Sequence, residues 1–404
     1  MYIYKAGVVG AGTMGAEIAQ VITYSGLPVV LRDISEDLVA RGMEKIRAVY
    51  ASRVKKGKMT ESDVEAKMAL VTTATSLDAL ADADIVIEAV PEKMDLKKTV
   101  FAELDKVCRE STILATNTSA LSISAIASAT KRAGKVIGMH FFFPAHVMKL
   151  VEVIPGLATQ EDTVTDVTAF AESLRKLPVR VEECAGFLVN RLLMPYLNEA
   201  AYCLQEGAAD AKAIDAAAGS FGMPMGPLIL VDQLGLDVCA EVVGVLLGSY
   251  GYRMKPAEIW KKLQERKRFG AKTGAGFYVY SEGEKDLLPE IIAEVQKEKG
   301  VKGTPFSLER MLYPMVNEAA YCLEERVASA KDIDLAMIAG VGFPQAKGGL
   351  LAWADEVGLD TILATLERLH ASFGDRFFPA PRLRRMVDAG FLGKKTKRGF
   401  HEYT

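Results

Sequence analysis

The chain has 404 residues, half of them apolar, which excludes a disordered chain and exceeds what one ordinary core holds, so we expect two or three packed domains. A formal net charge of −3 argues against nucleic-acid binding through a basic surface, and residues 1–5 leave no room for a signal peptide, while no run approaches the ~20 apolar residues of a membrane span. Five cysteines without CxxC spacing predict reduced thiols in a cytoplasmic protein, with neither a disulfide framework nor a metal site.

The chain opens with a strand, a glycine-rich turn and a helix. Residues 3–9 have the pattern of a buried strand, residues 10–15 read GAGTMG, and residues 16–24 have a helical pattern. In a GxGxxG turn, the first glycine permits the tight bend, the second lets the backbone approach a pyrophosphate, and the third lets helix and strand pack closely. The residues predicted to contact a dinucleotide here are Gly10, Gly12, Thr13, Met14 and Gly15.

A second strand at residues 29–32 ends beside Asp33, about where a carboxylate holds the ribose hydroxyls of a dinucleotide. The negative charge of Asp33 would repel the 2′-phosphate of NADP and therefore favours NAD. Arg32 could instead accommodate that phosphate, so NADP is the alternative. NAD is the cofactor that we predict.

Alternating strands and helices continue the pattern. Strands at residues 85–88 and 112–116 each precede a helical pattern, which predicts a parallel sheet covered on both faces. Polar clusters follow these strands at residues 88–92 and 116–119, where ligands of open α/β sheets bind. Ordinary helix capping explains both clusters about equally well.

A helical insertion at residues 36–67 is longer than a simple crossover requires. It carries a cluster of basic residues, namely Arg53, Lys55, Lys56 and Lys58. A solvated helix end is the common explanation for such charge. The alternative is a clamp for a phosphorylated substrate handle.

A histidine and a glutamate lie in two further strand patterns, residues 135–142 and 148–154. If these strands are neighbours, His140 and Glu152 come together. A carboxylate hydrogen-bonded to one imidazole nitrogen fixes the tautomer and raises the basicity of the other nitrogen, which suits general acid/base catalysis. The alternative is a buried histidine satisfied by a nearby acid. The other histidines, His146, His370 and His401, lack an acid at a useful spacing, and we expect them to be surface or core residues.

From about residue 186 the pattern becomes helical, and it then repeats. Residues 195–204 (PYLNEAAYCL) return as residues 314–323 (PMVNEAAYCL), and later fragments recur in the same order. These repeats predict two tandem copies of one helical domain. The charged, glycine-containing stretch at residues 281–304 is the expected linker.

The two copies differ at a polar position near their start. Asn190 in the first copy corresponds to Glu309 in the second, so we expect the first copy to take part in the active site and the second to pack against it. The expected fold is an α/β Rossmann-type NAD-binding domain followed by two all-α helical domains in tandem. The expected boundaries are residues 1–184, with a helical insertion at about 36–69, then 185–283 and 304–404 for the two copies.

Taken together, the motifs resemble the L-3-hydroxyacyl-CoA dehydrogenase family. The resemblance rests on residues 10–15, 88–92 (EAVPE), 116–119 (TNTS), 140–142 (HFF), 148–152 (MKLVE) and 186–191 (GFLVNR), in the family's order over residues 1 to about 280. It implies the reversible oxidation of an L-3-hydroxyacyl-CoA to the 3-ketoacyl-CoA with hydride passing to NAD, as in fatty-acid β-oxidation.

The resemblance also implies roles for individual residues. His140 matches the general base and Glu152 the acid that orients it. Ser119 and Asn190 match polar partners near the substrate oxygen, and Ser119 is also placed where cofactor and acyl-CoA meet. Glu92 and Lys97 match contacts to the nicotinamide half of the cofactor. Arg53 and Lys56 match basic contacts to CoA.

The chain departs from the family at two points. Phe143 stands where the family usually has an asparagine that touches the cofactor. The tandem copies replace the single helical domain through which smaller members dimerise, so we expect a monomer or a weak dimer. Three alternatives have similar motifs. The first is a β-hydroxyacid dehydrogenase, which uses a lysine base in a long interdomain helix. The others are an L-gulonate dehydrogenase or lambda-crystallin-like protein and a non-catalytic NAD-binding protein.

Overall fold

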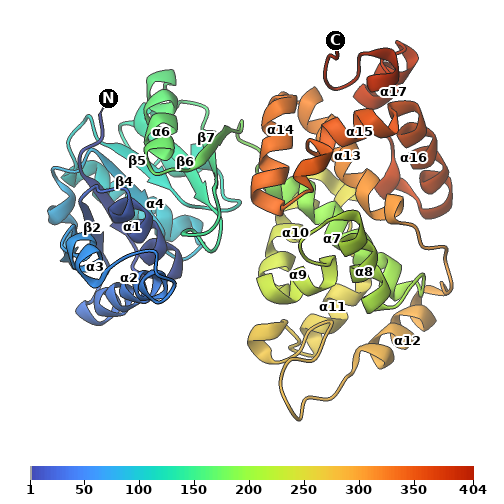
Figure 1. Cartoon of the computed structure of the whole chain (residues 1–404), viewed down its shortest axis with the longest axis horizontal. Coiled ribbons are helices and arrows are strands. Elements are labelled where there is room, and N and C mark those ends of the chain that lie inside the picture. Colours follow the sequence, from blue (N-terminus) through green and yellow to red (C-terminus); the bar gives the residue numbers. More distant parts are fainter. Residues whose placement is uncertain (1) are drawn as a thin grey trace. The chain divides into compact units, whose positions relative to one another are not determined.

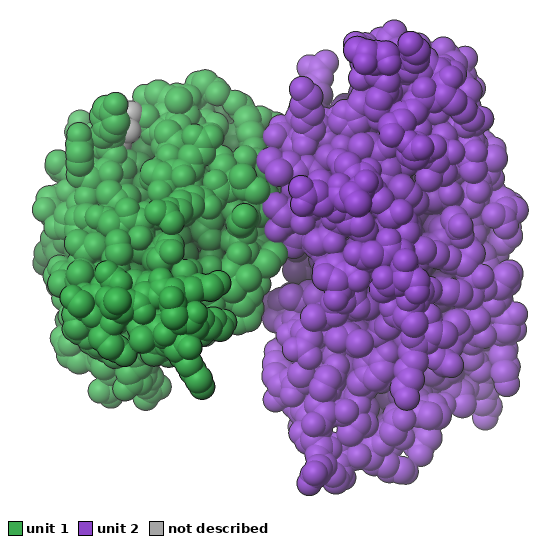
Figure 2. Space-filling view, in the orientation of Figure 1, with its two compact units in different colours: residues 1–187 green, residues 188–404 purple. Residues whose placement is uncertain are grey.

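The computed structural model describes residues 2–404 and divides into two compact units, Met1–Phe187 and Leu188–Thr404 (Figure 1; Figure 2). The first unit is an α/β domain and the second is entirely helical apart from short bridges. Within residues 2–404, no helix combines the length and the apolar character needed to cross a membrane.

The first unit is built on a single sheet of eight strands in the order β3-β2-β1-β4-β5-β6-β7-β8. The strands are β1 (Ala6–Val9), β2 (Val29–Arg32), β3 (Val71–Ala74), β4 (Ile85–Glu88), β5 (Ile113–Thr116), β6 (Val136–Phe141), β7 (Leu150–Pro155) and β8 (Leu177–Arg180). The central strands β1, β4 and β5 are fully buried and are apolar except for Glu88 and Thr116 at their carboxyl ends, as expected when helices cover both faces of a sheet.

Helices cover this sheet (Figure 1). They are α1 (Thr13–Tyr24), α2 (Glu36–Lys55), α3 (Glu61–Met68), α4 (Met94–Val107), α5 (Ile123–Ala127) and α6 (Glu161–Ser173). The insertion expected as one helical segment is two helices, α2 and α3. Gly57 adopts a positive φ of 65° after α2, and Thr60 with Asp63 forms a capping box that starts α3.

One strand pair breaks the parallel pattern. All neighbouring strands are parallel except β6 and β7, which are antiparallel. A parallel connection needs a crossover of about a dozen residues or more, whereas only residues 142–149 lie between these two strands. The prediction of a parallel sheet, made for the alternating strand–helix units, is confirmed for them, and β7 joins the sheet antiparallel to β6.

The second unit contains two copies of one helical arrangement. Copy one has α7 (Val189–Gln205), α8 (Ala211–Phe221), α9 (Pro227–Leu234), α10 (Leu236–Tyr250) and α11 (Glu258–Glu265). Copy two has α13 (Leu308–Glu324), α14 (Ala330–Ala336), α15 (Leu350–Val357), α16 (Leu359–Phe373) and α17 (Pro381–Asp388). The first helices of the copies, α7 and α13, pack against each other.

The repeat extends to individual hydrogen bonds. In copy one the buried carboxylate of Asp215 accepts from the Leu228 backbone N–H at 2.9 Å, and in copy two Asp334 accepts from Leu351 at 2.6 Å. Each aspartate thus satisfies a donor that the first turn of the next helix leaves unpaired. Tandem duplication of a helical domain is therefore a property of the structure as well as of the sequence.

The linker between the copies is not an extended segment. It contains helix α12 (Leu288–Lys299), which packs against α11 (Figure 1). Lys262 of α11 is 2.7 Å from Glu294 and 2.7 Å from Glu298 of α12. The charge that suggested a linker in the sequence is the exposed face of an amphipathic helix whose apolar face, including Ile291 and Val295, is buried.

Candidate active site

The glycine-rich turn lies between β1 and α1, and its three glycines meet different constraints. Gly10 has a φ of +103°, and a Cβ there would lie 2.6 Å from the Ala89 carbonyl oxygen. A Cβ on Gly15 would lie 1.7 Å from the Gly10 carbonyl oxygen. A Cβ on Gly12 would meet nothing within 4 Å. Packing thus explains Gly10 and Gly15, whereas the space beside Gly12 fits the approach of a pyrophosphate.

The same turn presents the positive end of a helix. Gly12 is the N-cap of α1, no side chain caps this end, and the first turn has no acidic residue. An anion bound there is favoured by the helix dipole. Asp33, after β2, accepts from the Ala11 backbone N–H at 2.6 Å, so its carboxylate lies at the turn. Arg32 donates from Nε to the Thr75 carbonyl at 3.0 Å.

A buried polar network follows β4. Glu88 is fully buried and accepts from Lys97 Nζ and from the Val90 N–H, each at 2.7 Å. Its other oxygen accepts from the Thr116 hydroxyl of β5 at 2.7 Å. Lys97 also lies 3.2 Å from Glu92. The lysine therefore ties together the two carboxylates of the 88–92 loop at the carboxyl end of the sheet.

The 116–119 loop joins this network through Glu92. The Thr118 hydroxyl donates to Glu92 Oε1 at 2.5 Å, and Ser119 donates to the same oxygen from its backbone at 2.9 Å and its hydroxyl at 3.2 Å. Burial alone would raise the pKa of Glu92, but the charge of Lys97 and these hydrogen bonds lower it. Glu92 and Ser119, predicted separately, are thus direct neighbours. Helix capping does not account for this cluster: Thr118 accepts from the Leu121 N–H, but the next helix, α5, begins at Ile123 and its cap is Ser122.

His140 and Glu152 face each other across the antiparallel pair β6–β7. The register pairs the two residues, and His140 Nδ1 lies 2.7 Å from Glu152 Oε2. The histidine is 7% exposed and the glutamate is fully buried. The Phe142 ring lies 4.4 Å from the imidazole, centroid to centroid, and the Phe187 ring 6.0 Å.

This arrangement assigns different tasks to the two imidazole nitrogens. An ionised carboxylate only accepts hydrogen bonds, so Nδ1 carries the proton and Nε2 has the lone pair. The aromatic walls limit water around the ring, which strengthens the interaction of Glu152 with an imidazolium. His140 can therefore take a proton at Nε2 and return it.

Several residues that support this pair are not evident from the sequence. Asn117 accepts from the Phe141 N–H at 2.8 Å and so fixes the strand beside His140. The loop after β6 is held by Glu17, which accepts from the Ala145 N–H, and by Lys176, which donates to the Met148 carbonyl at 2.7 Å. Burial lowers the pKa of Lys176 to about 8. The TNTS motif could have indicated Asn117, but Glu17 lies in α1 and Lys176 lies between α6 and β8, both far from this loop in the sequence.

Phe143 lies in this supported loop but is not part of its core. Its side chain is 61% exposed, as is that of Val147 in the same loop. The peptide bond between Phe143 and Pro144 is cis. The residue that replaces the family's asparagine is therefore an apolar ring on the surface of the first unit.

The predicted CoA contacts lie on the insertion. Arg53, in the last turn of α2, stacks its guanidinium over the Tyr24 ring at 4.2 Å, and Arg175 approaches the same ring at 5.4 Å. Arg53 Nε is buried without a hydrogen-bond partner. Lys56 is the exposed C-cap of α2. Asn190, the remaining predicted site residue, is half-buried in the first turn of α7, in the helical unit.

The expectation that the other histidines lack a paired acid is wrong. Each lies near a carboxylate, at 3.4, 3.0 and 2.7 Å respectively, in the pairs His146 with Glu17, His370 with Asp375, and His401 with Asp334. Two of these acids are far away in the sequence, and only packing brings them close. Among residues 2–404 there is no group of three or more histidine, cysteine or acidic side chains that could hold a metal ion.

The fold and the site define the class of protein: a Rossmann-type dinucleotide-binding domain that carries a buried histidine–carboxylate pair, followed by helical C-terminal domains. Residues 5–184 match the NAD-binding domain of 3-hydroxyacyl-CoA dehydrogenase, and residues 186–280 and 306–403 match its C-terminal domain. The chain belongs to the 3-hydroxyacyl-CoA dehydrogenase family.

Individual relatives agree with this membership. The crystal structure of 3-hydroxybutyryl-CoA dehydrogenase from Escherichia coli K12 has a TM-score of 0.87 and 32% identity, covering 97% of this chain and 100% of that one. The fatty acid oxidation complex subunit alpha of Shewanella loihica is 40% identical over 96% of this chain and 56% of its own length. The peroxisomal fatty acid beta-oxidation multifunctional protein MFP2 of Arabidopsis thaliana is 35% identical over 96% and 55%. The chain spans about half the length of these two curated relatives.

Proposed function

We propose that this chain catalyses the reversible oxidation of an L-3-hydroxyacyl-CoA to the 3-ketoacyl-CoA with NAD as hydride acceptor. The observation that carries the proposal is the buried His140–Glu152 pair, with its 2.7 Å hydrogen bond, in the sheet that also carries the glycine turn. A base of this kind solves a specific problem, because hydride leaves an alcohol carbon readily only as the hydroxyl loses its proton.

The proposed reaction divides the two hydrogens of the alcohol. The glycine turn and Asp33 would hold NAD, which when bound would supply the hydride acceptor for C3. His140 accepts the hydroxyl proton at Nε2, and the C–O bond becomes the ketone. Glu152 stabilises the resulting imidazolium through Nδ1 without itself taking the proton. In the reverse direction, His140 returns the proton from Nε2 to the ketone oxygen.

The proposed ligand contacts follow from the positions described above and from the family resemblance. For catalysis they are His140, Glu152, Ser119 and Asn190. For NAD they are Gly10, Gly12, Thr13, Met14, Gly15, Asp33, Glu92, Lys97 and Ser119. For the CoA moiety they are Arg53, Lys56 and Ser119. We propose the same domain division as the sequence predicts, residues 1–184, 185–283 and 304–404, with the insertion at about 36–69 as the CoA-binding part.

We infer that the protein is a monomer or a weak dimer, with copy two in place of a partner subunit. The packing of α7 against α13 supports this, because the face of α7 that a second chain could use is covered by copy two. Light scattering of the whole chain at micromolar concentration tests it. A tight dimer built on copy one would contradict it.

We also propose a cytoplasmic location. The five cysteines are free, and four of them are buried, as expected in a reducing compartment. The Arabidopsis relative is named as peroxisomal, so fractionation of the native cells distinguishes the two compartments.

The decisive experiment is NADH oxidation against a panel of 3-ketoacyl-CoAs, from acetoacetyl-CoA upward and including branched, aromatic and dicarboxylic thioesters. His140→Gln should abolish turnover and leave NADH affinity unchanged, because the glycine turn is untouched. Activity on free sugar acids, with no turnover of any thioester, would favour the L-gulonate dehydrogenase or lambda-crystallin-like alternative. NADH binding without turnover of either class would favour a non-catalytic NAD-binding protein.

A further inference from the structure

A buried cluster of ion pairs joins the two helical copies beside the start of α7. Arg191 of copy one donates from Nε to Glu318 at 2.8 Å and from Nη1 to Glu325 at 2.7 Å, both in copy two. Its guanidinium lies 4.1 Å from the centroid of the Tyr250 ring. Arg253 contributes a further contact to Glu318 at 3.3 Å. We call Arg191, Arg253, Glu318 and Glu325 the Arg191 cluster.

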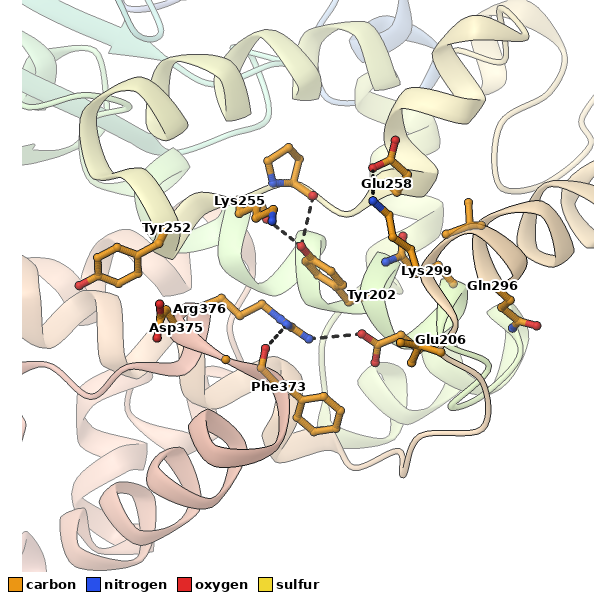
Figure 3. A pocket seen from close by; sticks show the side chains of 15 residues that line it. Tyr202, Glu206, Tyr252, Lys255, Glu258, Gln296, Lys299, Phe373, Asp375 and Arg376 are labelled. Atoms are coloured by element: carbon orange, nitrogen blue, oxygen red, sulfur yellow. Dashed lines mark hydrogen bonds and ion pairs between the residues drawn. The ribbon is translucent and has the colours of Figure 1, made fainter.

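The repeat builds a second cluster at the equivalent positions. Arg310 of copy two donates to Glu199 and to Glu206 of copy one, both at 2.6 Å. Arg376 reinforces it at 2.8 Å from Glu199. Figure 3 shows Arg376 between the Phe373 carbonyl and the Glu206 carboxylate, beside a cavity of about 470 Å³. We call Arg310, Arg376, Glu199 and Glu206 the Arg310 cluster.

The two clusters differ in how well their donors are paired. Each side-chain nitrogen of Arg310 has an acceptor. By contrast, Arg191 Nη2 and Arg253 Nε are buried without a hydrogen-bond partner. The Arg191 cluster therefore pairs its buried donors less completely than the Arg310 cluster does, and a buried donor without a hydrogen bond destabilises the interface.

The starts of the two equivalent helices differ as well. Helix α13 is capped by Ser307, whose hydroxyl accepts from the Arg310 N–H at 3.3 Å. Helix α7 begins after Leu188, which provides no side-chain cap. In copy one, ion pairs from copy two hold the residue that follows Asn190. In copy two, a local cap already holds the corresponding turn, and Glu309 stands in the place of the asparagine.

We propose that Glu318 and Glu325 of copy two position the Asn190 side chain through Arg191. The inference rests on the proposed role of Asn190 in the reaction. Two carboxylates hold the Arg191 guanidinium at two nitrogens, which restricts its side-chain torsions and the backbone of the first turn of α7. A displacement of about 1 Å at a positioned group can cost about a hundredfold in rate. Copy two is therefore a positioning element for copy one and not only a packing partner.

The duplication provides a matched pair of variants. Glu318→Gln and Glu199→Gln each remove one buried charge of nearly equal exposure, 3% and 2% respectively, from equivalent sites. Both should lower the melting temperature. Only Glu318→Gln should lower kcat, by about ten- to a hundredfold, with the KM for NADH unchanged. Glu199 lies nine residues beyond Asn190, about 13 Å along the helix, so its variant should retain kcat.

Further variants separate this inference from the proposed function. If Glu318 acts through Asn190, the double variant Asn190→Ala/Glu318→Gln should be no slower than Asn190→Ala alone. Additive losses would overturn the inference. So would equal kcat values for Glu318→Gln and Glu199→Gln when Asn190→Ala is slow, although the proposed function would then stand. Normal kcat in Asn190→Ala would remove the role of Asn190 and the inference together. Glu325→Gln, with a side chain 40% exposed, is the substitute if Glu318→Gln does not fold.

Discussion

Glutamine in place of Glu152 should reduce kcat by about three orders of magnitude without unfolding the protein. The carboxylate is fully buried and 2.7 Å from His140 Nδ1. When His140 takes the substrate proton, the two charge centres are about 4 Å apart, and at an effective dielectric constant of about 20 their attraction is about 4 kcal/mol. Since about 1.4 kcal/mol corresponds to a tenfold rate change, loss of this attraction slows the reaction about a thousandfold.

The glutamine amide has a further effect in the same direction. It can donate to Nδ1 and thereby stabilise the tautomer in which Nε2 carries the proton, so that Nε2 no longer accepts one. Glu152→Asp is the matched control, because it keeps the charge but withdraws it by one methylene. Its kcat should lie between those of the wild type and Glu152→Gln.

The assay follows NADH consumption with a 3-ketoacyl-CoA that the wild type turns over. NADH affinity, measured by fluorescence titration, should be unchanged in both variants because the glycine turn is distant in the sheet order. Thermal denaturation checks that each variant is folded. A folded Glu152→Gln protein with kcat within about tenfold of wild type would refute the electrostatic role of Glu152.

Three other variants test the cofactor turn and copy two. Gly12→Ala should fold normally, because its Cβ meets nothing within 4 Å, but it should bind NADH at least about tenfold more weakly. Gly15→Ala should also lose stability, because its Cβ would lie 1.7 Å from a backbone oxygen. Equal NADH affinity in Gly12→Ala and wild type would argue against a phosphate at this turn. Asp33→Ala should raise the KM for NAD about ten- to a hundredfold, because charge-assisted hydrogen bonds are lost. It should also bring the KM values for NAD and NADP closer together, and an unchanged ratio of the two KM values would contradict this. The hydrogen bond to Asp334 raises the pKa of His401 above 6.5, so the stability that this pair contributes is complete below pH 6.5 and is lost as the pH rises through the pKa of the folded state. His401→Tyr replaces the histidine with the tyrosine found at the equivalent position of copy one, and it should weaken the dependence of the melting temperature on pH. An unaltered dependence would exclude the His401–Asp334 pair as its source.

Much of the fold and part of the site could be predicted from local patterns. The strand at Val29–Arg32 and the strand at Ile85–Glu88 have the expected bounds, because a strand covered on both faces is a short apolar run and each run ends in a charged residue at the carboxyl edge of the sheet. The GAGTMG turn could be predicted because the tight bend and the close packing of helix and strand require glycine at fixed positions of a short motif. The juxtaposition of His140 with Glu152 was also foreseeable, since both lie on strands joined by a short connection.

Other features could not be predicted from local patterns. Helix α12 was expected as a linker, because its charged residues are also typical of one. Lys97 was expected at the cofactor, and its buried contact with Glu88 appears only when the ends of two structural elements meet.

The sequence by itself determined the glycine-rich turn, the pairing of His140 with Glu152 and the duplication of the helical domain, because each depends on residue types at short or repeated spacing. Only the tertiary structure decided which residues of copy two form ion pairs with which residues of copy one. Arg191 and Glu318 are far apart in the chain, and their ion pair exists because α7 packs on α13. Contacts of this kind depend on how two helices are placed, and no periodicity within either helix specifies that placement.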